Sequence, residues 1–193
     1  MRCCSVNSEK RKMKSNRNFC YRSVVNVSVF ATVLSLVLIL TVPIGTAEAE
    51  SSTLGQLSIP SLSLEATVVQ VPLAYPSWDL SHLGANVGYL EGTGQSNQPG
   101  NMVIAGHSTT PQLAPSVFAN LHNLHIGDEI IVSIGGSEKR YIVNSVSRVE
   151  ATDLSPVMPT AHEQLTLLTC AIESFQANSA SYSQRYIVVA MPA

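Results

Sequence analysis

Short apolar runs separated by turn-forming residues make up the chain after residue 55. Aliphatic and β-branched residues recur at 56–59, 66–71, 102–105, 129–134, 141–149, 164–169 and 185–191. Turn signals between them include Asn97-Gln98-Pro99-Gly100, Gly135-Gly136-Ser137 and Ser155-Pro156. Because no segment there keeps a helical period for long, the pattern predicts strands and favours a small antiparallel barrel or sandwich.

Two local patterns refine the strand prediction. The runs 130–134 and 141–149 flank Gly135-Gly136, a spacing that predicts a β-hairpin. In the last run, a period of two places Arg185 on the same face as Ile187. We therefore expect Arg185 to begin a strand whose other members are buried.

Helical patterns after residue 55 are confined to two short stretches. The first is 116–124, where Pro115 stands at the start and Val117, Leu121 and Leu124 share one face. The second is 159–163. We predict one short helix in each stretch.

The first 47 residues have a different pattern, with a basic segment followed by a long uncharged one. Most of the 11 basic residues of the chain lie before position 23, namely Arg2, Lys10, Arg11, Lys12, Lys14, Arg17 and Arg22. The apolar part of the next segment, 24–44, has about the 20 residues that a helix needs to cross a bilayer core. Positive charge before this segment predicts a cytoplasmic N-terminus, so everything from about Glu48 onward is expected to be exported.

The apolar segment is either a retained anchor or a cleaved signal. Ala47-Glu48-Ala49 has the small-x-small form of a signal-peptidase site, whereas the length of the apolar and basic regions favours an uncleaved anchor. We predict a cytoplasmic segment at 1–22, a transmembrane anchor at 23–46, a linker at 47–55 and an extracytoplasmic domain at 56–193. The protein is then a single-pass protein of the cell membrane.

The predicted extracytoplasmic domain is acidic. Only four of its side chains carry a permanent positive charge, those of Lys139, Arg140, Arg148 and Arg185, against 12 acidic residues from Glu48 onward. This balance argues against a nucleic-acid partner. It also makes each remaining arginine a candidate for a specific role.

Cys170 is the only cysteine in the predicted extracytoplasmic domain. Structural cysteines of exported proteins are usually oxidised in pairs. Cys3, Cys4 and Cys20 fall on the predicted cytoplasmic side or at the membrane boundary, so we expect none of them to pair with it. Cys170 is then either a small buried hydrophobe or a nucleophile.

A cysteine nucleophile needs a base or cation beside it and a donor for the oxyanion that forms when it attacks a carbonyl. His107 is the best-placed histidine, because it follows the apolar strand 101–106 and begins a polar loop. The other histidines fall in loop-like contexts, at His82, His122, His125 and His162. No His-x-x-x-His pair on a convincing helix and no cysteine cluster in the sequence supports a zinc site.

Three segments resemble motifs of the sortase family. Leu165-Thr166-Leu167-Leu168-Thr169-Cys170 resembles its Thr-Leu-x-Thr-Cys signature, and Val103-Ile104-Ala105-Gly106-His107-Ser108 resembles the strand that presents its histidine. Arg185-Tyr186-Ile187-Val188-Val189-Ala190 resembles the strand that begins with its arginine. The order of the three matches, and the similarity extends from about Gly55 to the C-terminus, behind an anchor.

The resemblance implies an all-β fold, a closed and mostly antiparallel eight-stranded barrel with short helices, whose three key residues gather at one end of a groove. It implies a membrane-anchored cysteine transpeptidase that cuts a Leu-Pro-x-Thr-Gly-like sorting signal between Thr and Gly and transfers the protein to a cell-wall or pilin amine. Cys170 would carry the thioacyl group, His107 would act as acid and then base, and Arg185 would hold the substrate carbonyl or its oxyanion. No cofactor or metal ion is implied. The expected partners are sorting-signal peptides of exported proteins, an acceptor amine or water, and the membrane.

Several alternatives stay open at this point. A hydrolase would pass the same thioacyl intermediate to water, and a non-catalytic module would bind surface peptides without using the thiol. An L,D-transpeptidase is disfavoured because its histidine and cysteine are expected close together in one motif. The acids Glu150, Asp153 and Glu173 resemble the calcium ligands of some sortases, although scattered carboxylates usually form a solvated face.

Overall fold

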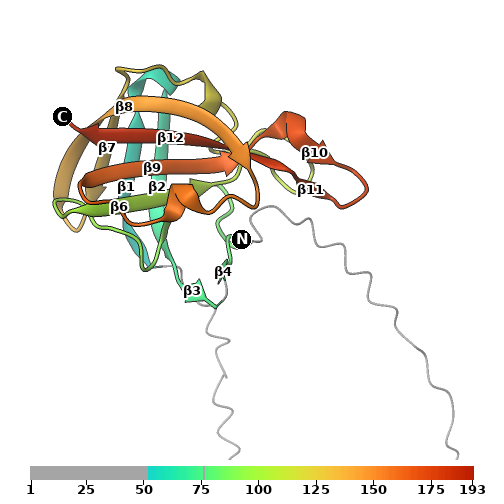
Figure 1. Cartoon of the computed structure of the whole chain (residues 1–193), viewed down its shortest axis with the longest axis horizontal. Coiled ribbons are helices and arrows are strands. Elements are labelled where there is room, and N and C mark those ends of the chain that lie inside the picture. The colour runs from blue at the N-terminus through green and yellow to red at the C-terminus, as the bar shows by residue number, and fades with distance from the viewer. Residues whose placement is uncertain (1–51, 76) are drawn as a thin grey trace, which may run out of the picture. The chain divides into compact units, whose positions relative to one another are not determined.

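The computed structural model describes residues 52–75 and 77–193, which fold around a closed barrel (Figure 1). The barrel strands follow the order β1-β2-β5-β6-β9-β12-β8-β7, and all neighbours are antiparallel except the parallel pairs β2–β5 and β6–β9. Their bounds are β1 Thr53–Ile59, β2 Leu64–Val71, β5 Val87–Leu90, β6 Gly100–Gly106, β7 Glu129–Ile134, β8 Ser137–Glu150, β9 Glu163–Cys170 and β12 Gln184–Pro192. The prediction of a closed, mostly antiparallel eight-stranded barrel is confirmed.

The predicted N-terminal segments fall largely outside the described residues. The cytoplasmic segment 1–22 and the anchor 23–46 are among them, and so is most of the linker. β1 already begins at Thr53, earlier than the predicted strand at 56–59. In the part of the chain that the structure describes, no helix has the length and apolar character needed to span a membrane.

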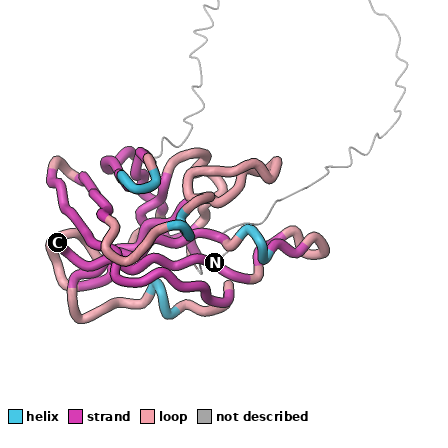
Figure 2. Tube along the Cα trace, turned by 90° about the horizontal axis from the view of Figure 1, so that it is seen from above, coloured by secondary structure: helices cyan, strands magenta, loops and turns pink. Residues whose placement is uncertain are grey.

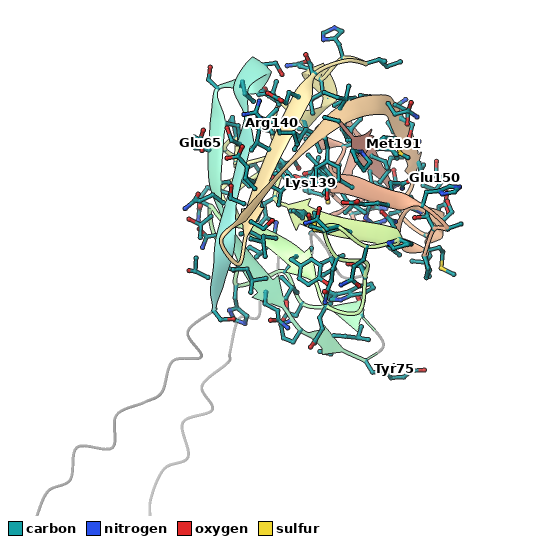
Figure 3. The ribbon with its side chains drawn as sticks, turned by 90° about the vertical axis from the view of Figure 1, so that its left-hand side faces the viewer. Glu65, Tyr75, Lys139, Arg140, Glu150 and Met191 are labelled. Atoms are coloured by element: carbon teal, nitrogen blue, oxygen red, sulfur yellow. The ribbon has the colours of Figure 1, made fainter. Side chains whose placement is uncertain are left out.

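Minor elements lie in the connections between the barrel strands. Two ribbons pair β3 (Leu73–Ala74) with β4 (Ser77–Trp78) and β10 (Phe175–Gln176) with β11 (Ser181–Tyr182). The helices are single 3-10 turns, coloured cyan in Figure 2: η1 Pro60–Leu62, η2 Leu121–Asn123, η3 Ser155–Val157 and η4 Ile172–Ser174. Tyr75, between β3 and β4, points away from the barrel and is 94% exposed (Figure 3).

Both helix predictions need correction. Within 116–124 only the 3-10 turn η2 forms, because the Ser116 and Phe118 backbone N–H groups donate to the carbonyls of Ser108 and His107 instead of continuing a helix. No helix forms at 159–163, where the His162 carbonyl accepts from Gly100 and Glu163 already begins β9. In both places hydrogen bonds to the strand β6 or the loop after it replace local helical ones.

The hairpin predicted around Gly135-Gly136 is confirmed as the turn between β7 and β8. Both glycines have positive φ, 60° and 80°. A two-residue turn of this kind matches the right-handed twist of the flanking strands, and glycine adopts it without steric cost. The turn therefore fixes the register of β7 on β8, with Ile134 opposite Ser137.

Alternation along the strands builds two apolar clusters, one inside the barrel and one on its outer face. In β6, Met102 and Ile104 belong to the inner cluster, whereas Val103 and Ala105 belong to the outer one. A fully buried aliphatic side chain contributes about 1.5–3 kcal/mol to folding, so both clusters stabilise the barrel. The segment that contains Leu80 and Leu83 packs against the outer cluster and covers it.

A polar network ties together the end of the barrel at which β6 and β9 begin. Glu163 accepts hydrogen bonds from the Asn97 backbone (2.8 Å), the Tyr141 hydroxyl (2.9 Å) and the Lys139 ammonium (3.3 Å). Burial alone would raise the pKa of Glu163, but these three donors outweigh it and lower the pKa below its ordinary value. Burial, together with the Glu163 carboxylate, raises the pKa of Tyr141 to about 12. The network holds the connection between β5 and β6 against β8 and β9.

Candidate active site

Three neighbouring strands carry the candidate catalytic residues side by side, in a row formed by His107, Cys170 and Arg185. Cys170 ends β9, and its Cα pairs directly with that of Arg185, the second residue of β12. β6 runs parallel to β9 with Ala105 opposite Leu168, so His107, two residues further on, continues this alignment to Cys170. Adjacent strands are about 4.8 Å apart, which brings the three backbones close together.

The row lies on the outer face of the barrel. A period of two puts His107 on the face of Ala105, Cys170 on the face of Leu168 and Arg185 on the face of Ile187. Ala105, Leu168 and Ile187 all belong to the outer apolar cluster. β6, β9 and β12 run side by side in Figure 1, and the ribbon β10–β11 projects beyond the end that carries the row. The three candidate residues therefore stand at one end of the outer apolar cluster.

Arg185 is buried although it carries a permanent charge. Its side chain is 5% exposed, and its guanidinium donates to the backbone carbonyl of Ala151, the residue after β8. Arginine is almost never buried without partners, because desolvating its charge is costly. The fold therefore holds a fixed cation directly beside Cys170.

Cys170 is also buried, with 3% of its surface exposed. It is disulfide-bonded in the structure. The expectation that Cys170 has no disulfide partner is therefore wrong for this structure. Nucleophilic chemistry at Cys170 requires the reduced thiol.

His107 is half-buried and held by a backbone carbonyl. Its Nε2 lies 2.8 Å from the carbonyl oxygen of Leu80. A carbonyl only accepts hydrogen bonds, so Nε2 carries the proton in this contact. In the neutral ring Nδ1 is then the nitrogen that can take up a proton. The contact also joins His107 to the segment that covers the outer apolar cluster.

Gly106 precedes His107 because a side chain would not fit there. A Cβ at this position would lie 2.5 Å from the ring of Phe118, which is fully buried. The Phe118 backbone N–H in turn donates to the His107 carbonyl at 2.9 Å. The glycine therefore provides close packing that fixes the strand end, rather than flexibility.

The Thr169 hydroxyl ties the strand of Cys170 to the strand of His107. It donates a hydrogen bond of 2.8 Å to the carbonyl of Gly106, and Thr169 is only 2% exposed. Sequence patterns alone favour an ordinary strand role for this hydroxyl. In the structure it joins the residues that directly precede the two candidate catalytic side chains.

We expect Thr169→Val to lower kcat by about ten-fold with little change in KM, because the substitution removes this tie without touching the outer apolar cluster. Thr169→Ser, which keeps the hydroxyl, should restore kcat. Thr93→Val is the matched control, since the Thr93 hydroxyl also donates to a strand-end carbonyl, that of Leu90, far from the row. Steady-state kinetics and thermal unfolding of all three variants separate positioning from stability. Equal kcat losses in the Thr169→Val and Thr93→Val variants would contradict this role.

The connection from β9 to β12 contains a ribbon that touches the loop after His107. The Tyr182 hydroxyl lies 2.7 Å from the Thr109 hydroxyl, and the Tyr182 ring packs on Phe175 with centroids 5.1 Å apart. The sequence gives no signal for this ribbon. This contact links the loops that follow His107 and Cys170.

A second contact holds the turn directly after Cys170. Glu173 accepts from Arg148 (2.9 Å) and from the Tyr186 hydroxyl, which joins η4 to β8 and β12. The hydrogen bond from Tyr186, with a further contribution from Arg148, lowers the pKa of Glu173 below its ordinary value. Glu150 is engaged elsewhere, by Gln184 at 2.8 Å. The three acids considered as calcium ligands do not converge, and no group of three or more potential metal ligands occurs among the described residues.

The remaining histidines do not join the row. His82 lies on the surface, 3.9 Å from Asp79, and His122 stacks on Tyr186 with ring centroids 5.2 Å apart. His125 and His162 are exposed. Among the five histidines, the one chosen from its place at a strand end is the one that aligns with Cys170.

Comparisons with known proteins agree with this geometry. A family model described as the Sortase domain matches residues 57–193. A curated relative, Sortase A of Bacillus anthracis, is 30% identical over 138 residues, which is 70% of this chain and 57% of that protein. This chain therefore spans little more than half the length of that relative.

Solved structures show the same fold. Sortase A from Corynebacterium diphtheriae, a lid mutant, superposes with a TM-score of 0.61 at 24% identity, covering 76% of this chain and 73% of that one. Sortase C1 from Streptococcus agalactiae superposes with a TM-score of 0.60 at 22% identity, covering 76% and 70%. At these identities the structural likeness shows the fold alone.

Proposed function

Because the chain belongs to the sortase family, we propose that it is a cysteine transpeptidase that cuts a Leu-Pro-x-Thr-Gly-like sorting signal between Thr and Gly. One observation carries the proposal, namely the row of His107, Cys170 and Arg185 across β6, β9 and β12. The row combines a thiol, an imidazole and a guanidinium. These are the groups that acyl transfer through a thioester needs.

In the first half-reaction, the Cys170 thiolate attacks the carbonyl carbon of the signal's Thr. The oxyanion that forms accepts hydrogen bonds from the Arg185 guanidinium, whose charge does not titrate in the working range. The Thr–Gly bond then breaks, and protonated His107 gives its proton to the leaving Gly amine. The products are a thioester on Cys170 and a peptide with a new N-terminal Gly.

In the second half-reaction, an acceptor amine attacks the thioester carbon. His107, now neutral, removes a proton from this amine. The C–S bond breaks and the Cys170 thiolate is restored, while a new amide joins the sorted protein to the acceptor. A cell-wall or pilin amine fits this step, and water in its place gives hydrolysis.

The outer apolar cluster below the row is the proposed site for the Leu and Pro side chains of the signal. Its residues Ala105 and Leu168 are 0% and 2% exposed under the segment of Leu80, so this segment would have to move aside for the peptide to bind. Beside the cluster runs the connection between β8 and β9, which Asn101 holds by donating to the carbonyls of Pro156 (2.8 Å) and Met158 (3.1 Å). An extended peptide along this cluster would bring its Thr carbonyl to Cys170.

We further propose that residues 23–46 anchor the enzyme in the cell membrane, with 1–22 in the cytoplasm and the barrel outside. The basic residues before the apolar segment support this orientation. The substrates would then be exported proteins that carry the sorting signal.

The molecule that attacks the thioester, an amine or water, distinguishes a transpeptidase from a hydrolase. We expect the full chain, reduced with a thiol reagent, to cleave a Leu-Pro-x-Thr-Gly peptide faster when a glycyl peptide amine is added, and to yield the joined product. The reason is that amine attack on a thioester outruns attack by water in a site that excludes solvent. Mass spectrometry of the products measures the outcome, and a peptide with Thr and Gly exchanged is the control. Equal rates with only the hydrolysed product would favour the hydrolase, and no cleavage of any signal-like peptide would favour a binding module.

A further inference from the structure

The end of the barrel opposite the row holds a cavity of about 530 Å³. Leu54 of β1, Met102 of β6 and Ile134 of β7 form its apolar floor. Met102 precedes His107 by five residues along β6, which is about 16 Å at the usual rise of a strand. The cavity is therefore separate from the proposed catalytic row, and its size falls in the range of pockets that bind small molecules.

The wall of the cavity is held in a defined conformation. It is formed by the connection between β5 and β6, in which the Thr93 hydroxyl donates to the Leu90 carbonyl (2.7 Å) and accepts from the Val103 N–H (3.2 Å). The same connection is tied to the Glu163 network through the Asn97 backbone, and the Ser96 hydroxyl lies 3.3 Å from that of Tyr141. A wall fixed at both ends forms a site before any ligand arrives.

The polar lining carries neutral groups and a single charge. Amides come from Gln70, Gln95 and Asn97, and hydroxyls come from Ser96 and Ser137. Glu91 is the only charged residue of the lining. Its carboxylate already accepts from the Leu73 N–H (3.0 Å) and the Gln70 amide (3.3 Å), so each of its oxygens has one donor. The carboxylate disfavours anionic ligands, and the other polar groups of the lining are neutral.

We infer that this cavity is a second binding site and that it takes a neutral saccharide. Sugar hydroxyls both donate and accept, and the amides and hydroxyls of the rim offer both functions. The remaining lone pairs of Glu91 can accept from two adjacent hydroxyls. The C–H face of a sugar ring packs on apolar surface, which Leu54, Ile134 and the ring of Tyr89 supply. This site is independent of the peptide chemistry proposed for the other end of the barrel.

Trp78 reports on the cavity. Its indole N–H donates to the Glu91 carbonyl at 2.9 Å, and it is the only tryptophan of the chain. A ligand that engages Glu91 alters the surroundings of this hydrogen bond. Tryptophan fluorescence therefore senses binding there, while ligand-observed NMR detects binding of any kind.

The test titrates the full chain with cellotetraose and with N-acetylchitotetraose. We expect saturation-transfer NMR signals and a saturable fluorescence change with at least one of them, but neither with butylamine at the same concentration. Ser137→Phe adds a ring at the exposed rim and should weaken binding by at least about ten-fold. Asn144→Phe places the same ring at an exposed position on the same strand, outside the lining, and should leave binding unchanged.

Each other outcome overturns the proposal. If neither saccharide gives a saturation-transfer NMR signal, the cavity is not a saccharide site. If the Ser137→Phe variant binds the saccharide as well as the original protein does, the saccharide binds outside this cavity. If only butylamine binds, the ligand class of this cavity is an amine and not a saccharide. Peptide cleavage should be retained in the Ser137→Phe variant, so failure of this proposal is distinguishable from failure of the proposed transpeptidase.

Discussion

Replacing Cys170 by alanine is expected to abolish cleavage of sorting-signal peptides, with a loss in kcat/KM of at least about 10³-fold. Without the thiol no thioester forms, and the remaining groups of the row, His107 and Arg185, can only assist attack by water. A loss of this size corresponds to about 4 kcal/mol of transition-state stabilisation. Peptide cleavage followed by liquid chromatography measures it, and mass spectrometry of the unmodified enzyme should show a peptide adduct on Cys170.

A matched control separates Cys170 from the other cysteines of the chain. The triple variant Cys3→Ala, Cys4→Ala and Cys20→Ala removes every other thiol and leaves only Cys170, so it should retain cleavage. It also removes every cysteine with which Cys170 can form an intramolecular disulfide, so its activity should not depend on a reductant. Cleavage that survives Cys170→Ala, or that disappears in the triple variant, would refute the assignment of the nucleophile.

Most of the barrel could be predicted from the sequence because its strands carry a strong local signal. The run 102–105 is apolar on both faces, and the structure places Met102 and Ile104 inside the barrel and Val103 and Ala105 under the segment of Leu80. The alternation in 185–191 predicts Arg185 on the face of Ile187, and both residues are buried in the structure. The alignment of His107 with Cys170 followed from their shared position at strand ends, together with the resemblance to sortase motifs.

The contacts that hold the residues of the row in place could not be predicted from the sequence, because they join segments that are distant in the chain. The Leu80 carbonyl that accepts the hydrogen bond of His107 belongs to the backbone, which any residue type would supply. The contact between the Thr109 and Tyr182 hydroxyls joins residues 73 positions apart. The helix expected at 116–124 failed for the same reason, since its N–H groups bond to the loop after β6. Local periodicity contains no information about these competing partners.

The second large effect is expected at Arg185, where Arg185→Lys should lower kcat by about 10²–10³-fold. Lysine keeps the charge but loses the planar fork that donates to an oxyanion while it also bonds to Ala151. Removing one oxyanion donor typically costs about 2.7–4 kcal/mol in the transition state. KM should change little, because the oxyanion exists only after Cys170 attacks. Single-turnover measurement of thioester formation locates the loss in the first half-reaction.

Arg148→Lys is the matched control for Arg185. Arg148 lies on the neighbouring strand β8, pairs with Glu173 of η4 and stands outside the row. The side chain of Arg148 is 47% exposed, so its ion pair contributes at most about 1 kcal/mol and kcat should stay within about two-fold of the original. Thermal unfolding of both variants shows whether the barrel is intact. If Arg185→Lys lowers only the unfolding temperature and leaves kcat unchanged, Arg185 serves the fold alone, and the oxyanion donor must be a backbone N–H group near Cys170. A loss of kcat at an unchanged unfolding temperature assigns the donor to the guanidinium.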